Sequence, residues 1–248
     1  MILDRLDDGF SRINPEWRGC TVVIFGGGDS LTLEQVNKCR VHHEAGRIRA
    51  IGVNDAFLWA PWVDILYAAD SRWWLWTEAG TAKPKIGITA EECARRYKFF
   101  SGEKLSIQRS GGNTTDPSIH KLRNRDHPSN AGLGLSLDPT KLVTARGSGY
   151  QAVNAGVLAL GATETVRIPD GRIILLGFDG HPGKDGQAHW FGNHPLSETI
   201  EVYEHFRKAF SAGETAILGT GVEILNCSPG TWYDNFPKMP LDAALARI

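Results

Sequence analysis

Four short apolar runs, each ending in glycine or small polar residues, constrain the fold of this chain more than any other feature of its sequence. They span Cys20–Phe25, Ile48–Val53, Val63–Ala69 and Arg172–Asp179. Runs of this length and composition are typical of buried strands. Helical patterns lie between them, and such alternation predicts right-handed βαβ units around a parallel sheet. The sequence therefore predicts an α/β fold of the Rossmann-like type, with a mostly parallel sheet and helices on both faces.

Weaker patterns predict the remaining elements. A helix begins within Asp29–Val36, where Asp29, Ser30 or Thr32 can cap it and Glu34 or Gln35 can complete the first turn. A further helix is predicted over Gly149–Leu160, with Gly161 as the stop, and an amphipathic helix over Leu196–Ala212. Short strands are predicted at Lys98–Phe100, Leu105–Gln108, Ala216–Leu218 and Glu223–Asn226.

Residues 77–145 differ from the rest of the chain. Between Ser110 and Ser129 they are rich in Gly, Asn, Ser, Asp and Arg. A long irregular stretch inside a compact domain is typical of a functional or mobile segment. We expect one Rossmann-like domain over residues 1–248, with 77–145 inserted as a partly irregular, lid-like segment.

Composition narrows the function classes. Lys+Arg 27 against Asp+Glu 28 gives a net charge of −1, so no overall basic surface for nucleic acid is expected. A hydrophobic fraction of 42% excludes disorder of the whole chain. No apolar run reaches the about 18 residues of a membrane helix, and the acidic start MILDRLDDGFSR is unlike a signal peptide. A cytoplasmic protein without a membrane span is expected.

Polar and small residues gather where the predicted strands end, and ligands of open α/β sheets bind at that edge. The candidate binding residues are Gly26, Gly27, Gly28, Asp29, Ser30, Asn54, Asp70, Ser228 and Thr231, with Asp179 as a further candidate. The segment GGGDSL lacks the third glycine of a dinucleotide fingerprint, and no P-loop Gly-Lys-Ser/Thr follows it. It is either a tight strand-to-helix turn or a phosphate site made of backbone N–H groups.

Two histidines, His189 and His194, lie in the loop after the last of the four main strands. Their spacing does not place them on one helix face, and no third ligand for zinc is evident, so no metal is expected. Imidazole can accept a proton near neutral pH, which favours a catalytic base in this loop. Surface histidines without a role are the alternative.

Four segments, in the same order along the chain, resemble a known family. GGGDSL resembles the G-N-G-P-S-L start of bacterial CMP-sialic-acid-dependent sialyltransferases and of the related MptE-like pterin diphosphokinase and motility-accessory proteins. GSGYQAVNAGVLALGA with IILLGFDG, then HWFGNHPLSETIEVYEHF, then ILNCSPGTWYDNFP resemble the family's later motifs. The resemblance covers most of the chain outside residues 77–145. Similar proteins are common in phages and prophages, so the expected cell is a bacterium or a phage-infected host.

The resemblance implies roles for particular residues. Asn54 matches the asparagine that contacts cytidine or phosphate, while Gly27 and Asp29 stand where the family has asparagine and proline. The tyrosines that hold the leaving phosphate have no clear counterpart within Gly180–Ala188.

The family's catalytic histidine falls on Asn193, with His194 one residue later, and its first histidine falls on His189. Asp179 matches the aspartate of its L-x-G-x-D motif. The chemical step would thus involve His194 as the preferred base, then His189, and Asp179.

The favoured function is a glycosyltransferase that uses a nucleotide-activated sugar, CMP-linked by preference, with no metal and an acceptor that the sequence does not identify. One alternative is pyrophosphoryl transfer from ATP, in which Mg²⁺ would need carboxylates such as Asp70 and Asp179. The other is a catalytically inactive phage accessory or nucleotide-binding protein. The sequence is compatible with a homo-oligomer.

Overall fold

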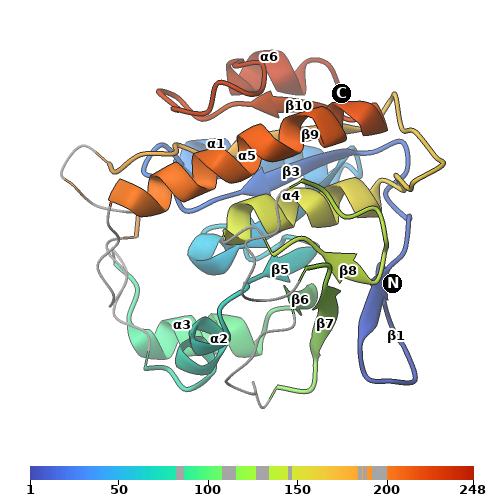
Figure 1. Ribbon diagram of the computed structural model, residues 1–248. Helices are drawn as coiled ribbons and strands as arrows, with labels where there is room; N and C mark the ends of the chain where they lie inside the picture. The colour runs from blue at the N-terminus through green and yellow to red at the C-terminus, as the bar shows by residue number, and fades with distance from the viewer. Residues whose placement is uncertain are drawn as a thin grey trace.

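A computed structural model of the protein describes residues 1–81, 87–107, 116–126, 134–144, 147–183, 186, 189–191 and 200–248. Within them, an eight-stranded sheet has the order β10-β9-β3-β4-β5-β6-β7-β8, and all neighbouring strands are parallel (Figure 1). Its strands are β3 Thr21–Phe25, β4 Ile48–Val53, β5 Ile65–Tyr67, β6 Glu103–Ile107, β7 Ile119–Asn124, β8 Lys141–Leu142, β9 Arg172–Leu176 and β10 Glu223–Asn226. The predicted α/β fold is confirmed.

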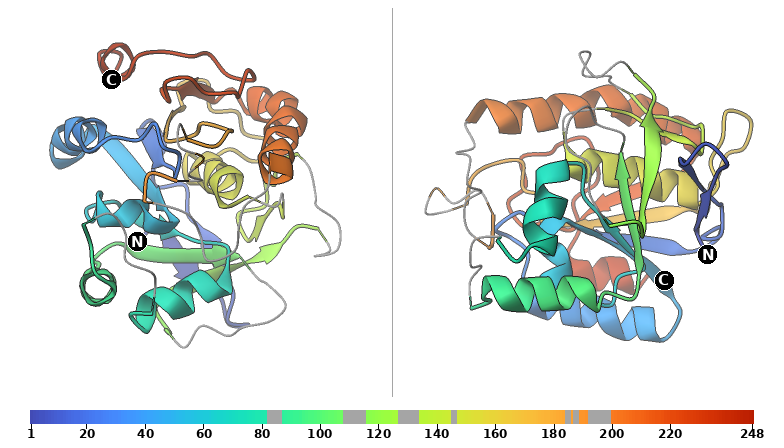
Figure 2. Two further views of the ribbon diagram at one scale, coloured as in Figure 1. Left: turned by 90° about the vertical axis from the view of Figure 1, so that its left-hand side faces the viewer. Right: turned by 90° about the horizontal axis from the view of Figure 1, so that it is seen from below.

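Helices cover both faces of the sheet (Figure 2). One face packs on α4 Ser148–Ala159 and α5 Ile200–Thr220, and the other on α1 Leu33–Glu44, α2 Ser71–Glu78, α3 Ala90–Lys98 and α6 Leu241–Leu245. Within β3, Val22 and Ile24 join the first core while Val23 and Phe25 join the second, because successive side chains of a strand point to opposite faces. A strand buried on both faces must be apolar throughout, which is why its run stands out in the sequence.

Smaller elements complete the described chain. β1 Leu3–Arg5 and β2 Ser11–Ile13 form an antiparallel pair, and the 3-10 turn η1 Asn54–Leu58 follows β4. The predicted cap of the first helix is confirmed for one of its candidates. The Thr32 hydroxyl accepts a hydrogen bond from the backbone N–H of Gln35, whose side chain accepts one from the N–H of Thr32.

Two predicted strands are wrong. Lys98–Phe100 covers the end of α3 and the turn after it, and Ala216–Leu218 lies inside α5. A three-residue apolar run fits a strand and a helical turn equally well, so its neighbours in the chain decide. The predicted helix Leu196–Ala212 is confirmed from residue 200 onward, and residues 196–199 lie outside the described residues. No described helix, α5 included, is long and apolar enough to cross a membrane.

The described parts of residues 77–145 mostly belong to the main layers. They form α3 and the strands β6, β7 and β8, which extend the sheet beyond β5. The prediction of an irregular stretch between Ser110 and Ser129 is therefore wrong for Ile119–Asn124, which form β7. Only Ile119 and Leu122 of β7 are buried, so its pairing with β6 rests on backbone bonds that leave no apolar pattern in the sequence. Residues 108–115 and 127–133 lie outside the described residues, and the lid and the single-domain boundary stay predictions.

The direction in which strands are added reverses at β3. β4 to β8 follow one another on one side of it, and the chain then returns through α4 to place β9 and β10 on the other side. Ligands of open α/β sheets bind beyond the carboxyl ends of the strands at such a reversal. A site is therefore expected where β3 and β9 end.

Candidate functional site

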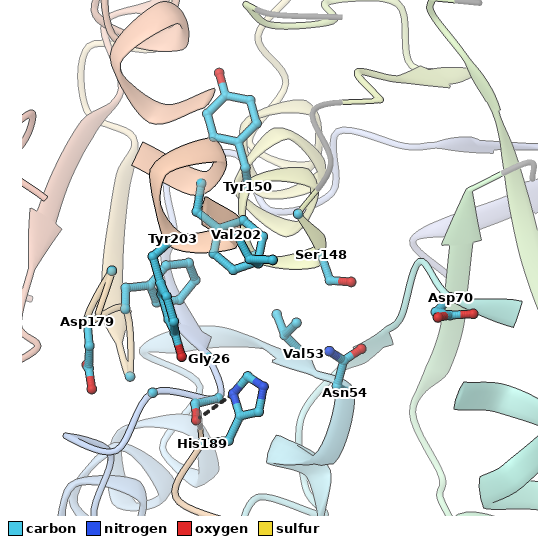
Figure 3. Close-up of a pocket in the computed structure, with 18 of the residues that line it drawn as sticks. Gly26, Val53, Asn54, Asp70, Ser148, Tyr150, Asp179, His189, Val202 and Tyr203 are labelled. Carbon is cyan, nitrogen blue, oxygen red and sulfur yellow. Dashed lines mark hydrogen bonds between the residues drawn. The ribbon is translucent and has the colours of Figure 1, made fainter. Parts of the chain in front are cut away.

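A cavity of about 430 Å³ opens at this place, beyond the ends of β3, β4, β5 and β9 (Figure 3). The turns after these strands form one side of it, and the start of α4 with part of α5 forms the other. A volume in this range suits a small organic ligand. Of the residues selected from the sequence, the cavity brings together Gly26, Gly27, Gly28, Asn54, Asp70, Asp179 and His189.

The three glycines after β3 allow other segments to approach the end of this strand. A β-carbon on Gly28 would lie 2.5 Å from the carboxyl carbon of Asp179, and one on Gly27 would lie 2.8 Å from Nδ1 of His189. A β-carbon on Gly26 would lie 2.5 Å from a carbonyl oxygen in the turn after β9. None of the three has a positive φ. Glycine is thus required here for close contact, not for a left-handed backbone.

Three backbone N–H groups of this turn have acceptors in the protein. Gly26 and Gly28 donate to the carbonyl oxygens of Leu176 and Gly177, at 2.7 and 2.8 Å. Ser30 donates to a buried carboxylate oxygen at 2.9 Å. The first two bonds extend the pairing of β3 with β9, and the third holds a side chain. The phosphate site expected from GGGDSL is therefore not formed by these three N–H groups.

That carboxylate belongs to Asp179, which is 3% exposed. It accepts hydrogen bonds from both the N–H and the hydroxyl of Ser30. Burial raises the pKa of Asp179, and the two bonds from Ser30 act in the opposite direction. Asp179 borders the cavity, but its oxygens face Ser30, which suits an anchor for the turn after β3. Asp29 is exposed and does not line the cavity.

His189 lies beside the glycine turn with a defined ring orientation. Its Nδ1 is 3.2 Å from the carbonyl oxygen of Gly27 (Figure 3), and its ring stacks on Phe191 with centroids 4.7 Å apart and planes at 14°. A carbonyl oxygen can only accept, so Nδ1 must carry the proton. The neutral ring then has its basic lone pair on Nε2, on the side of the ring away from Gly27.

Asn54 holds an unusual backbone conformation at the end of β4. It is the only described residue other than glycine with a positive φ, at 52°, and asparagine tolerates this region better than most residues. Its side chain lines the cavity (Figure 3) and makes no hydrogen bond to the other described residues. Strained residues of this kind concentrate at ligand sites.

Asp70 and Arg72 form an ion pair at the cavity, where α2 begins. Asp70 caps α2 by accepting from the N–H of Arg72, and the two side chains meet at 2.7 Å. Arg72 is the only lysine or arginine among the described residues that line the cavity. In the described ranges, no three His, Cys, Asp or Glu residues are grouped as metal ligands would be. Asp70 and Asp179 are instead engaged with Arg72 and Ser30.

The start of α4 is a part of the site that the sequence did not suggest. Gly147, Ser148 and Gly149 line the cavity, and no side chain caps the helix there. The N–H groups of a first helical turn and the helix dipole both favour an anion. Glycine at position 149 also allows close packing, because a β-carbon would lie 3.0 Å from the ring of Phe178.

An aromatic wall completes the cavity on the side of α4 and α5. It consists of Tyr150, Tyr203, Phe206 and Phe210, with Val202 beside them. The Tyr150 hydroxyl donates to a backbone carbonyl at 2.7 Å, and burial raises the pKa of this phenol. The amphipathic pattern of α5 predicted an apolar face, but only the packing shows that part of this face borders a cavity.

The cavity is not lined by four of the described site candidates, which are Asp29, Ser30, Ser228 and Thr231. Ser228 and Thr231 are buried behind it, where their hydroxyls bond the N–H and the carbonyl of Phe178 at 2.8 and 2.7 Å. They fix the turn after β9 and do not line the cavity. His194 lies outside the described residues.

Comparisons with known proteins bear on the fold. No family model matches the sequence, and no curated protein matches it at a significant level. Among solved structures, the chain is similar to that of the MAf glycosyltransferase from Magnetospirillum magneticum AMB-1, with a TM-score of 0.50 and 17% identity. The match covers 94% of this chain and 35% of the other, so this chain spans about a third of that protein's length. At this identity, the similarity shows a shared fold.

Proposed function

We propose that the protein transfers a sugar from a nucleotide-activated donor, CMP-linked by preference, to a hydroxyl acceptor in this cavity. The observation that carries the proposal is His189, whose bond to Gly27 leaves a basic nitrogen beside the carboxyl ends of the strands. The glycosyltransferase activity named for the structural neighbour supports the same class. Fold alone does not determine activity, which depends on the residues that line the cavity.

The proposed step is a single displacement. Nε2 of His189 takes the proton of the acceptor hydroxyl while that oxygen bonds to the anomeric carbon of the donor sugar. The bond from this carbon to the phosphate oxygen breaks, and its electron pair leaves with CMP. Attack and departure on opposite sides invert the anomeric configuration. His194, the base preferred from the sequence, lies five residues further on and is the second candidate.

The donor would be held by the polar part of the cavity. The amide of Asn54 can bond the nucleoside or its phosphate, and the N–H groups at the start of α4 can bond phosphate oxygens. Arg72 lies beside them in its ion pair with Asp70, so a phosphate would share the guanidinium with that carboxylate or displace it. These donors suit a leaving phosphate without a metal, which is why we propose a metal-independent reaction.

The other two hypotheses have less support. Pyrophosphoryl transfer from ATP would draw on Asp70 and Asp179, which would first have to release Arg72 and Ser30. A catalytically inactive protein would still bind a nucleotide in the cavity but would not transfer a sugar. Both are outcomes of the experiments below.

Ligand binding is the first test. Melting temperatures are compared with CMP, UDP, GDP, ADP and ATP, each with and without Mg²⁺. A ligand at 100 times its Kd stabilises by about 2.7 kcal/mol, roughly 5–11 °C for a chain of this size. We expect the shift with CMP alone. A shift only with ATP and Mg²⁺ would favour pyrophosphoryl transfer, and no shift at all would contradict every nucleotide hypothesis.

Transfer activity is the second test. With the best CMP-sugar and acceptor, His189→Gln should lower kcat at least about a hundredfold, the scale of a general base, while CMP affinity stays within about twofold. The exposed His205 on α5 offers a matched control, since His205→Gln should leave kcat unchanged. Loss of activity in His194→Ala but not in His189→Gln would move the base to His194.

A further inference from the structure

Three aromatic rings, those of Trp59, Trp190 and Phe191, connect η1 to His189, and the proposed chemistry assigns no role to them. Trp59 stacks on Trp190, with ring centroids 3.6 Å apart and planes at 22°. Trp190 meets Phe191 edge-on at 5.1 Å and 88°, and Phe191 stacks on His189. The series therefore runs without interruption from Trp59 to the imidazole in the cavity.

The backbone ties this series to the glycine turn. The carbonyl oxygen of Gly27 accepts from the N–H of Trp190 at 3.1 Å and from Nδ1 of His189 at 3.2 Å. Trp190 is 3% exposed, so packing against its neighbours holds its ring in place. Trp59 directly follows η1, whose first residue is Asn54. The Trp59–Trp190 stack thus joins the two loops that carry Asn54 and His189.

We propose that Trp59 is a positioning residue for His189. Its stack on Trp190 keeps the segment of residues 189–191 against the carbonyl oxygen of Gly27, and this oxygen selects the Nδ1–H tautomer. Free neutral histidine favours the Nε2–H form, so the selection depends on the contact with Gly27. When the stack is lost, this contact loosens and both tautomers become populated. The tautomer follows from the geometry alone, whereas its effect on catalysis rests on the proposed function.

The tautomer is measured directly in the full-length ¹⁵N-labelled protein. Long-range ¹H–¹⁵N spectra at about pH 8.5, where imidazoles are neutral, separate protonated from unprotonated ring nitrogens. His189→Gln assigns the signals. In the wild type we expect Nδ1 protonated and Nε2 unprotonated. In Trp59→Leu we expect averaged shifts for both nitrogens, and Trp59→Phe should restore most of the wild-type pattern because a ring can still stack.

A second tryptophan provides a matched control. Trp62 is partly exposed like Trp59, but it packs against Phe25 and His43, away from the cavity. Trp62→Leu should leave the His189 signals unchanged. A wild-type Nε2–H tautomer, or wild-type signals in folded Trp59→Leu, would overturn the proposal. Should Trp59→Leu not fold, Trp59→Met is measured instead, with the same expected result.

Kinetics separate this inference from the proposed function. Trp59→Leu should lower kcat about tenfold, with the donor KM within about twofold, since only the orientation of the base changes. Averaged tautomers with unchanged kcat would keep Trp59 as a positioning residue and refute His189 as the base. Unchanged tautomers with lowered kcat would refute the role of Trp59 and leave the proposed function intact.

Discussion

Gly27 and Gly28, which follow β3, have different neighbours, so a methyl group added at each position would meet a different obstacle. On Gly28, the β-carbon would lie 2.5 Å from the carboxyl carbon of Asp179 and 2.6 Å from the carbonyl oxygen of Gly177. On Gly27, it would lie 2.8 Å from Nδ1 of His189. The first obstacle is backbone and a buried carboxylate, and the second is a side chain that can rotate. We expect Gly28→Ala to destabilise the fold and Gly27→Ala to displace the imidazole.

The expected magnitudes differ accordingly. Overpacking at Gly28 costs about 1–3 kcal/mol, and weakening the bonds from Ser30 to the buried carboxylate of Asp179 adds about 1–3 kcal/mol. The total of roughly 2–6 kcal/mol corresponds to a fall in melting temperature of roughly 4–24 °C. For Gly27→Ala, rotation of His189 relieves the contact, and the lower entropy of the unfolded chain offsets part of the loss. Its melting temperature should fall by less than about 4 °C.

Thermal unfolding followed by circular dichroism measures both variants under one set of conditions. The imidazole spectra of Gly27→Ala then report whether Nδ1 of His189 has left its acceptor. Equal melting temperatures for Gly27→Ala and Gly28→Ala would refute the assignment of the two obstacles. An unchanged His189 signal in Gly27→Ala would refute the contact between the two residues.

Further predictions concern other parts of the molecule. Because burial raises the pKa of Asp179, the folded state holds this proton more tightly than the unfolded chain, so the contribution of Asp179 to stability should fall as the pH rises from about 3.8 through its folded pKa. Urea titrations should show this slope reduced in Asp179→Asn; equal slopes would contradict it. Asn54→Ala should be about 1 kcal/mol less stable than Asn54→Gly, since φ is 52° there, while calorimetry should show CMP binding weakened in both. Stability that is the same in both variants would argue against strain at Asn54. Burial raises the pKa of the Cys39 thiol to about 12 and of Cys227 to about 11, so a thiol reagent should label the partly exposed Cys20 first in the native protein. Rapid labelling of Cys39 would show that α1 opens readily.

The sequence by itself determined the elements whose signals are local. The runs of β3 and β9 are apolar because both faces of the sheet are covered, and each ends in glycine where another segment approaches. The capping box of Thr32 and Gln35 depends only on residues three apart. The edge of the sheet where Gly27, Asn54 and His189 meet follows from the topology that these patterns imply.

Only the tertiary structure decided which of the candidates face the cavity. Asp179 borders the cavity with its oxygens bonded to Ser30, whereas Ser228 lies behind the cavity and bonds the backbone of Phe178. Tyr203 looked like part of an ordinary amphipathic helix, but it lines the cavity. The direction of a side chain at a strand end is set by partners far away in the sequence, such as Ser30 for Asp179. Periodicity and local motifs carry no information about such partners, because each contact exists only once the sheet and its helices have assembled.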